Sequence, residues 1–173
     1  MTRRRRARTA PPGSHGQTGH VRIYLPATID ELEPVDGHRQ LLAPRVVHTV
    51  TLALRRALPD EDEESCEFAA HLSAADDSLL RIADRPDAPR QRLVITAVVP
   101  ETSIERGDGD AAPSAVRLTV AVPWDRVVCL HVDELEARAD VTAALRGDEA
   151  AAARLSEADL LWYDVSEIDE LPR

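Results

Sequence analysis

The sequence predicts one α/β domain of the α+β kind, built on a mixed sheet of four to five strands with helices mainly on one face. Three observations support this fold class. The chain has 173 residues, enough for one domain with a core. Apolar residues make up 43% of it, near the usual share in globular proteins. Segments with the period of strands alternate with segments of helical period, in an order that resembles a split βαβ arrangement.

A strand and a short helical turn are predicted at the start of the folded region. Residues 21–25 alternate between apolar and polar side chains, and Pro26 ends the pattern. Thr28 and Glu31 have the spacing of a capping box, in which each side chain pairs with backbone N–H groups of the first helical turn.

Two helices are predicted next. Apolar residues at helical spacing predict a helix over 44–58, which Pro59 ends. Residues 60–64 are five consecutive acids, and they favour a helix N-terminus because the helix dipole stabilises negative charge there. The second helix has apolar residues at helical spacing and ends near Pro86. Its predicted buried stripe consists of Phe68, Leu72, Ala75, Leu79 and Ile82.

Three strands are predicted in the centre of the sequence. Residues 92–99 are apolar nearly throughout, as in a strand buried on both faces. A polar loop over 101–114 follows. Residues 116–122 alternate and predict a strand with one exposed face, and residues 127–132 predict another apolar strand.

The C-terminal part is predicted to be mainly helical. Asp133 can cap a helix that Gly147 closes. The alanine-rich residues 148–155 predict a further helix, residues 160–163 a short last strand, and residues 166–171 a terminal helical turn.

The charge of the chain is divided unevenly. Residues 1–20 carry five arginines and no acid, and the whole chain has a formal charge of −10, so residues 21–173 carry −15. We expect residues 1–20 to be a disordered basic tail and residues 21–173 to be the single globular domain. An acidic body repels nucleic acid and anionic membranes, and its charge favours solubility and a basic partner, with an unknown protein as one candidate. Nucleic-acid binding through the tail is a less favoured alternative.

No membrane-spanning or secretory segment is recognisable. The sequence has no run of about 18 apolar residues, and the basic start is not followed by the apolar stretch of a signal peptide. We therefore expect a cytoplasmic protein without a membrane partner.

Neither a metal site nor a cofactor site is predicted. Cys66 and Cys129 lie in apolar segments, where free thiols behave as small hydrophobic groups. Glu67 and His71 lie one helical turn apart near Cys66, but a metal site needs three or four ligands. No phosphate-binding glycine loop is present.

His131 and Asp133 are the candidate catalytic residues. They lie two residues apart at the end of a predicted strand, where α/β proteins often hold their chemistry. A nucleophile is not identifiable beside them, and helix capping explains Asp133 equally well. A small enzyme of unknown reaction that uses this pair is therefore the alternative function.

Aromatic residues are only 3% of the chain, so their placement is informative. The two tyrosines and two tryptophans lie next to predicted turns or strand ends, where they can line one pocket or interface. They are Tyr24, Trp124, Trp162 and Tyr163, and the candidate binding residues among them are Tyr24, Trp162 and Tyr163. Thr28 is the fourth candidate binding residue. The favoured function is a small acidic binding or interaction module without catalysis, and the sequence leaves its partner and oligomeric state open.

The sequence resembles an uncharacterised family of small proteins from high-GC Gram-positive bacteria. The resemblance covers residues 21–173 and implies no activity, cofactor or site. Because proteins of this type begin at the first strand, it also implies that residues 1–20 are a mis-assigned start and that the native chain begins at Val21, whose GTG codon is also a bacterial start codon. The matching residues are Arg22, Tyr24, Leu25, Pro26, Ala27, Thr28, Glu67, Phe68, Ala69, Ala70, Ser78, Leu79, Leu80, those at 92–97, Val132, Asp133, Leu161, Trp162, Tyr163 and Glu167.

Overall fold

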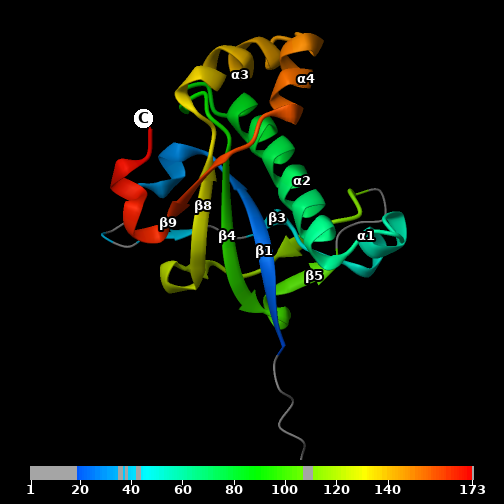
Figure 1. Cartoon of the computed structure of the whole chain (residues 1–173). Coiled ribbons are helices and arrows are strands. Elements are labelled where there is room, and N and C mark those ends of the chain that lie inside the picture. The colour runs from blue at the N-terminus through cyan, green and yellow to red at the C-terminus, as the bar shows by residue number, and fades with distance from the viewer. Residues whose placement is uncertain (1–18, 35–36, 38, 42–43, 107–110, 173) are drawn as a thin grey trace, which may run out of the picture.

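The computed structural model describes residues 19–34, 37, 39–41, 44–106 and 111–172. Most of the expected basic tail lies outside these residues. The main sheet has seven strands in the order β5-β6-β3-β1-β4-β8-β9, and each neighbouring pair is antiparallel (Figure 1). The strands are β1 (His20–Ala27), β3 (Arg45–His48), β4 (Leu93–Pro100), β5 (Ile104–Arg106), β6 (Ala115–Leu118), β8 (Val127–Val132) and β9 (Leu161–Asp164). A separate two-stranded sheet pairs β2 (Gln40–Leu41) with β7 (Val122–Pro123).

Helices and helical turns connect these strands. The α-helices are α1 (Leu52–Ala57), α2 (Glu63–Ala83), α3 (Arg138–Ala144) and α4 (Glu149–Glu157). The 3₁₀ turns are η1 (Ile29–Leu32), η2 (Glu101–Ser103), η3 (Trp124–Arg126), η4 (Leu135–Ala137) and η5 (Val165–Glu170). Within the described residues, no helix is both long and apolar enough to cross a bilayer.

The α+β class is confirmed, but two details of the predicted sheet are wrong. The sheet has seven strands rather than four to five, and it is antiparallel rather than mixed. The split βαβ arrangement is nevertheless present: β3 and β4 both pair antiparallel with β1, which lies between them, so β3 and β4 run parallel to each other and are joined through helices. The chain therefore passes from β3 through α1 and α2 to β4 on the other side of β1.

Strand β3 replaces the start of the helix predicted over 44–58. Its side chains alternate: Val47 is fully buried between β1 and β6, and Val46 is half exposed. Valine also has the stiff, β-branched side chain that suits a strand. The helix begins only at α1, where the Thr51 hydroxyl accepts a hydrogen bond from the Leu54 N–H.

Pro26 does not end β1, which continues to Ala27. The registered pair between β1 and β3 is Tyr24 with His48, so at Pro26 the ladder continues only to Val94 of β4. Proline is tolerated at a position with one neighbouring strand because its missing N–H then leaves no ladder bond unmade.

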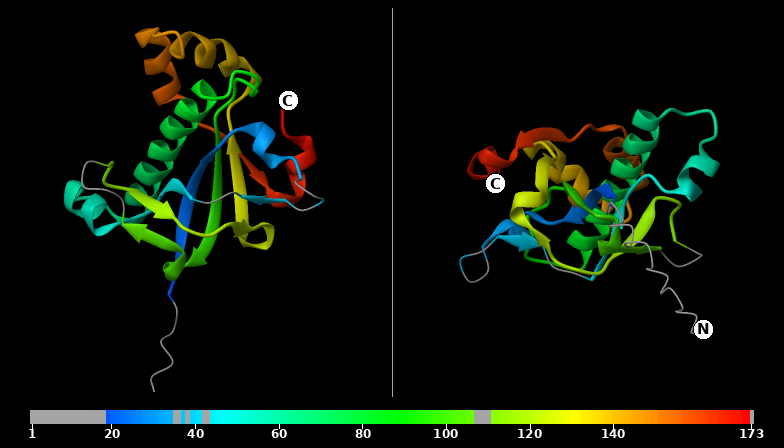
Figure 2. Two further views of the ribbon diagram at one scale, coloured as in Figure 1. Left: turned by 180° about the vertical axis from the view of Figure 1, so that it is seen from behind. Right: turned by 90° about the horizontal axis from the view of Figure 1, so that it is seen from below.

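The sheet is covered differently on its two faces. Figure 1 shows α2 lying across β1 and β4, with α3 and α4 beyond its C-terminal end. Seen from behind in Figure 2, η1 and η5 lie on the other face, and their apolar side chains join the main core. The helices thus lie mainly on one face, as expected. That main core includes Ile23, Leu25, Ile29, Leu32, Leu93, Ile95, Leu130, Val132, Ile168 and Leu171.

Helix α2 begins as the acidic run predicts, and of the predicted stripe it buries Ala75 and Ile82 but not Phe68. Asp62 is the N-cap and accepts a hydrogen bond from the Ser65 N–H. Small side chains face the sheet, because alanine lets a helix approach a sheet closely. Phe68 belongs to the predicted core stripe, yet it is 54% exposed. The buried residues of α2 are Cys66, Ala70, Ala74, Ala75, Ser78 and Ile82.

Candidate functional site

A groove of about 510 Å³ lies between the N-terminal half of α2 and the sheet. Its strand side is built from β1, β4 and β8, and the residues that lead into β9 close one end. The lining residues are Arg22, Tyr24, Glu64, Glu67, Phe68, His71, Thr96, Val128, Cys129, His131, Asp159, Leu160 and Trp162.

The strand period places the floor residues on one face. Tyr24 pairs with Thr96, and Thr96 pairs with Cys129, so three adjacent strands present these side chains side by side. His131 lies two residues beyond Cys129 and pairs with Trp162 of β9. Every one of these five side chains lines the groove.

A β-bulge adds Val128 to the groove. The register between β4 and β8 shifts between Thr96 and Ala97, so Val128 has no partner on β4. It consequently lines the groove beside Cys129 and is 45% exposed, although neighbouring residues of a regular strand point to opposite faces.

The helix contributes a second, separate stripe. Glu64, Glu67, Phe68 and His71 follow the spacing i, i+3, i+4 and i+7, which places them along one side of α2. This side is not the alanine-rich side that packs on the sheet. The spacing is visible in the sequence, but the prediction assigned Phe68 to the core and considered His71 only as a metal ligand.

His71 is the centre of an aromatic cluster inside the groove. Its ring centroid is 4.5 Å from that of His131 and 5.8 Å from that of Tyr24, both in edge geometry. The Phe68 ring is stacked on His71 at 6.4 Å. Edge and offset contacts of this kind favour aromatic pairs beyond the area that they bury.

Both groove histidines are neutral at pH 7. Burial, together with His131 and Arg92 nearby, lowers the pKa of His71 to about 4. Burial also lowers the pKa of His131. A neutral imidazole has one N–H donor and one nitrogen acceptor, so each ring can accept a hydrogen bond from a guest.

Unpartnered polar atoms are concentrated in the groove. Five buried side-chain polar atoms lack a hydrogen-bond partner among the described residues. Three of these belong to residues that line the groove, namely His71 Nε2, Thr96 Oγ1 and His131 Nδ1, and each of the three atoms has less than 1 Å² of accessible surface. Thr96 itself is only 4% exposed. Because buried polar atoms in proteins are nearly always paired, this concentration marks the groove as unusual.

Acidic and apolar side chains form the rim. The Arg22 guanidinium donates a hydrogen bond of 2.8 Å to Glu67. Glu64 and Asp159 are exposed and take part in no ion pair among the described residues. Phe68 is 54% exposed and Trp162 is 58% exposed, so large apolar surfaces face solvent across the groove.

The structure brings together two of the four candidate binding residues. Tyr24 and Trp162 line the groove. Tyr163, which follows Trp162 in the strand, packs against the core on the opposite face. Thr28 is fully buried, and its backbone N–H and hydroxyl bond to the Glu31 carboxylate in the predicted capping box, so its side chain stabilises η1.

His131 and Asp133 do not form a pair. Asp133 is 1% exposed, and its carboxylate accepts hydrogen bonds from the guanidinium and backbone N–H of Arg92. It does not cap a helix either, because Glu134 is the residue that precedes η4. A buried arginine requires such a counter-charge, and this requirement accounts for Asp133. The geometry therefore gives the alternative catalytic pair no support.

A hydrogen-bonded Ser–His–Asp chain occurs elsewhere, and the sequence analysis missed it. His48 Nε2 is 3.0 Å from Asp77 Oδ2, and His48 Nδ1 is 2.8 Å from Ser114 Oγ. Ser114 and His48 are each 1% exposed, so the hydroxyl is closed to a substrate. The chain links β3, α2 and the residue before β6. No sequence pattern could reveal it, because its members come from three separate elements.

Three further predictions bear on the site. Within the parts of the chain that the structure describes, no three His, Cys, Asp or Glu residues are grouped to hold a metal ion. Cys66 and Cys129 are buried and unpaired with each other, and Cys129 lines the groove. The five tail arginines, on which nucleic-acid binding would depend, lie outside the described residues.

Comparison with known proteins gives a family but no activity. The model of a family of unknown function, DUF6912, matches residues 21–171. No curated protein and no solved structure matches the chain. The match agrees with the resemblance found in the sequence.

Proposed function

The chain belongs to the family DUF6912, and we propose that it is a small cytoplasmic binding module whose ligand occupies the groove between α2 and the sheet. The observation that carries this proposal is the set of unpartnered atoms His71 Nε2, Thr96 Oγ1 and His131 Nδ1. A guest in the groove would pair with them after the side chains around it shift, because each atom has less than 1 Å² of accessible surface.

In the absence of a ligand, the unpartnered atoms lower the stability of the folded protein. Leaving a buried donor or acceptor unpaired costs about 1–3 kcal/mol, because the group loses its bond to water and gains none in the protein. An apolar residue at Thr96 would avoid this cost. Polar atoms at the floor and exposed aromatic rings at the rim are the usual composition of a ligand site, where polar groups orient a guest and apolar groups bury it.

Catalysis has less support. The acidic partner proposed for His131 is bound to Arg92, and the buried Ser114 hydroxyl is out of reach of a substrate. Binding without chemistry needs neither group. The polar atoms at the floor of the groove and the aromatic rings at its rim are sufficient for a binding role.

The proposal is tested by following the imidazole signals of His71 and His131 by NMR during a screen of small organic fragments. The screen should contain amines, carboxylates and neutral aromatic compounds. We expect one chemical class to shift both imidazoles in a saturable way, while the exposed His20 outside the groove does not respond. If no class shifts His71 or His131, or if His20 responds equally, the groove is not a ligand site.

A further inference from the structure

We infer that the guest of the groove is the side chain of an arginine on a basic segment of a partner protein. This inference rests on the proposed function and specifies its ligand. Three features of the groove favour a cationic ligand. They are hydrogen-bond acceptors at the floor, aromatic rings at the sides and unpaired carboxylates at the rim.

The floor of the groove contains atoms that can accept hydrogen bonds from a ligand. A guanidinium carries five N–H donors and no acceptor, so it needs a site lined with acceptors. Thr96 Oγ1 can accept a hydrogen bond, and because both imidazoles are neutral, His71 Nε2 and His131 Nδ1 accept one in the tautomer that carries the proton on the other ring nitrogen. The planar fork of arginine can reach several such acceptors at once, which a lysine ammonium does less well.

The walls offer aromatic surface to a flat cation. Phe68 and Trp162 stand exposed on the helix and strand sides of the groove, and the Tyr24 ring lies at its floor. A guanidinium stacks on aromatic rings and is attracted by their electron-rich faces, with the largest gain where water is excluded. The same rings can cover the apolar stem of the arginine side chain.

The rim carries negative charge that the protein itself does not neutralise. Arg22 is bound to Glu67, which leaves the carboxylates of Glu64 and Asp159 for a guest. Because residues 21–173 carry a formal charge of −15, the wider field also attracts a basic partner.

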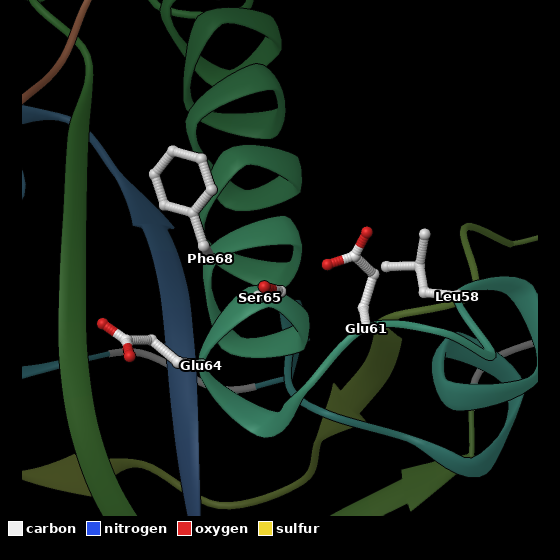
Figure 3. A pocket seen from close by; sticks show the side chains of 5 residues that line it. All are labelled: Leu58, Glu61, Glu64, Ser65 and Phe68. Carbon is white, nitrogen blue, oxygen red and sulfur yellow. The ribbon is translucent and has the colours of Figure 1, made fainter.

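A second hollow continues the groove and indicates a polypeptide rather than a small amine. It has a volume of about 580 Å³ and shares Glu64 and Phe68 with the groove. Figure 3 shows Phe68 and Glu64 projecting from one side of the first turns of α2, with Glu61 and Leu58 on its other side, where the chain arrives from α1. A peptide that places one arginine in the groove can therefore lay its next residues over a further acidic and apolar surface.

The test uses Trp162 as a fluorescent reporter. The other tryptophan, Trp124, packs at the main core, so Trp124→Phe leaves a single tryptophan in the groove. This protein is titrated with a short capped peptide that contains arginine, with the same peptide containing lysine, and with the same peptide containing citrulline. Citrulline is a neutral molecule of nearly the same shape as arginine. Free arginine amide tests whether a small molecule binds as tightly as the arginine peptide.

We expect a saturable change in Trp162 emission with the arginine peptide, weaker binding of the lysine peptide and free arginine amide, and no binding of the citrulline peptide. The double variant Glu64→Gln/Asp159→Asn should weaken arginine-peptide binding about tenfold, since it removes the unpaired carboxylates. The control Glu105→Gln/Asp87→Asn makes the same change in charge at exposed positions outside both hollows and should change binding less than about twofold.

Each contrary result has one meaning. Equal binding of the citrulline and arginine peptides overturns the cation while leaving a ligand groove in place. Equal losses of arginine-peptide affinity in the two double variants also overturn the cation as the specific ligand of the groove. The attraction would then come from the negative charge of the whole surface. Tighter binding of free arginine amide than of the peptide overturns the polypeptide partner. Failure of all four probes overturns the inference, and only an additional failure of the fragment screen overturns the proposed function.

Discussion

At the scale of single residues, the buried polar groups of this protein are of two kinds. Arg92 and Asp133 are almost fully buried and bind each other through several hydrogen bonds, with Gln91 bonding to the Asp133 carbonyl. Such a pair must be complete, since one buried charge alone is costly. The groove residues Thr96 and His71, in contrast, keep polar atoms without partners. The other two unpartnered atoms, on Asp30 and Arg45, belong to residues that form ion pairs through their remaining atoms.

The histidines of the groove predict a loss of stability at mildly acidic pH. The pKa of His71 is about 4 in the folded protein, against 6.5 for an ordinary histidine, so the unfolded chain binds a proton more readily over this range. Stability is therefore full above pH 6.5 and falls as the pH drops towards 4, by about 2–3 kcal/mol for His71 alone. His131 acts in the same direction because burial also lowers its pKa.

Chemical denaturation at a series of pH values measures this effect. Carboxylates with lowered pKa values, such as Glu31, destabilise the fold only below their usual pKa of 4.5, so a decline above that value reflects the histidines, while Asp76, whose pKa burial raises, acts in the opposite direction. His71→Gln should flatten the decline, and His20→Gln, at an exposed site outside the groove, should leave it unchanged. An equally steep decline in His71→Gln would show that His71 is not the titrating group.

At the scale of elements, the sequence is most informative where one period extends over many residues. The strands at 92–99 and 127–132, the long helix and the last strand are found close to their predicted places. The strands β3 and β5 are four and three residues long, too short for a period to be recognised. The helix predicted over 44–58 therefore includes the residues of β3.

The same limit applies to the site. Tyr24 and Trp162 could be selected because aromatic residues are rare here, and both line the groove. Phe68 was assigned to the core, since α2 carries two stripes of helical period and the sequence alone does not show which one faces the sheet. Only the packing of Ala70 and Ala74 against the strands decides that question. Thr96 has no distinguishing neighbours in a strand that is apolar nearly throughout.

A buried hydroxyl of α2 bridges two strands of the sheet. Ser78 Oγ accepts a hydrogen bond from the Leu93 N–H and donates one to the Ala27 carbonyl, and it is fully buried. Ser78→Ala leaves both backbone groups unpaired and should lower the free energy of unfolding by about 1–3 kcal/mol.

Ser73 of the same helix provides the matched control, because its hydroxyl bonds only to the Ala69 carbonyl one turn earlier. Ser73→Ala should change stability by less than about 0.5 kcal/mol. Urea denaturation of the two variants makes the comparison. Equal effects of the two substitutions would contradict the anchoring role of Ser78.

At the scale of the whole molecule, the two faces of the sheet have different roles. The face covered by η1 and η5 holds the main core, whose members are nearly all buried. The face covered by α2 is closed near the helix C-terminus, where α3 and α4 pack on Ile82. Towards the helix N-terminus the same face opens into the groove. Many arginines of the described residues form ion pairs with acids of the same chain. The acids that remain unpaired therefore give the surrounding electrostatic potential its negative sign.

The free energy of unfolding of Thr96→Val tests most directly whether the groove is built for a guest. Valine has the shape of threonine without the hydroxyl, and Thr96 Oγ1 has no partner among the described residues. If the hydroxyl serves a ligand, its removal should stabilise the free protein by about 1 kcal/mol and weaken binding of the arginine peptide. A loss of about 1 kcal/mol or more, with peptide binding unchanged, would show that Thr96 belongs to the fold and contradict the ligand groove.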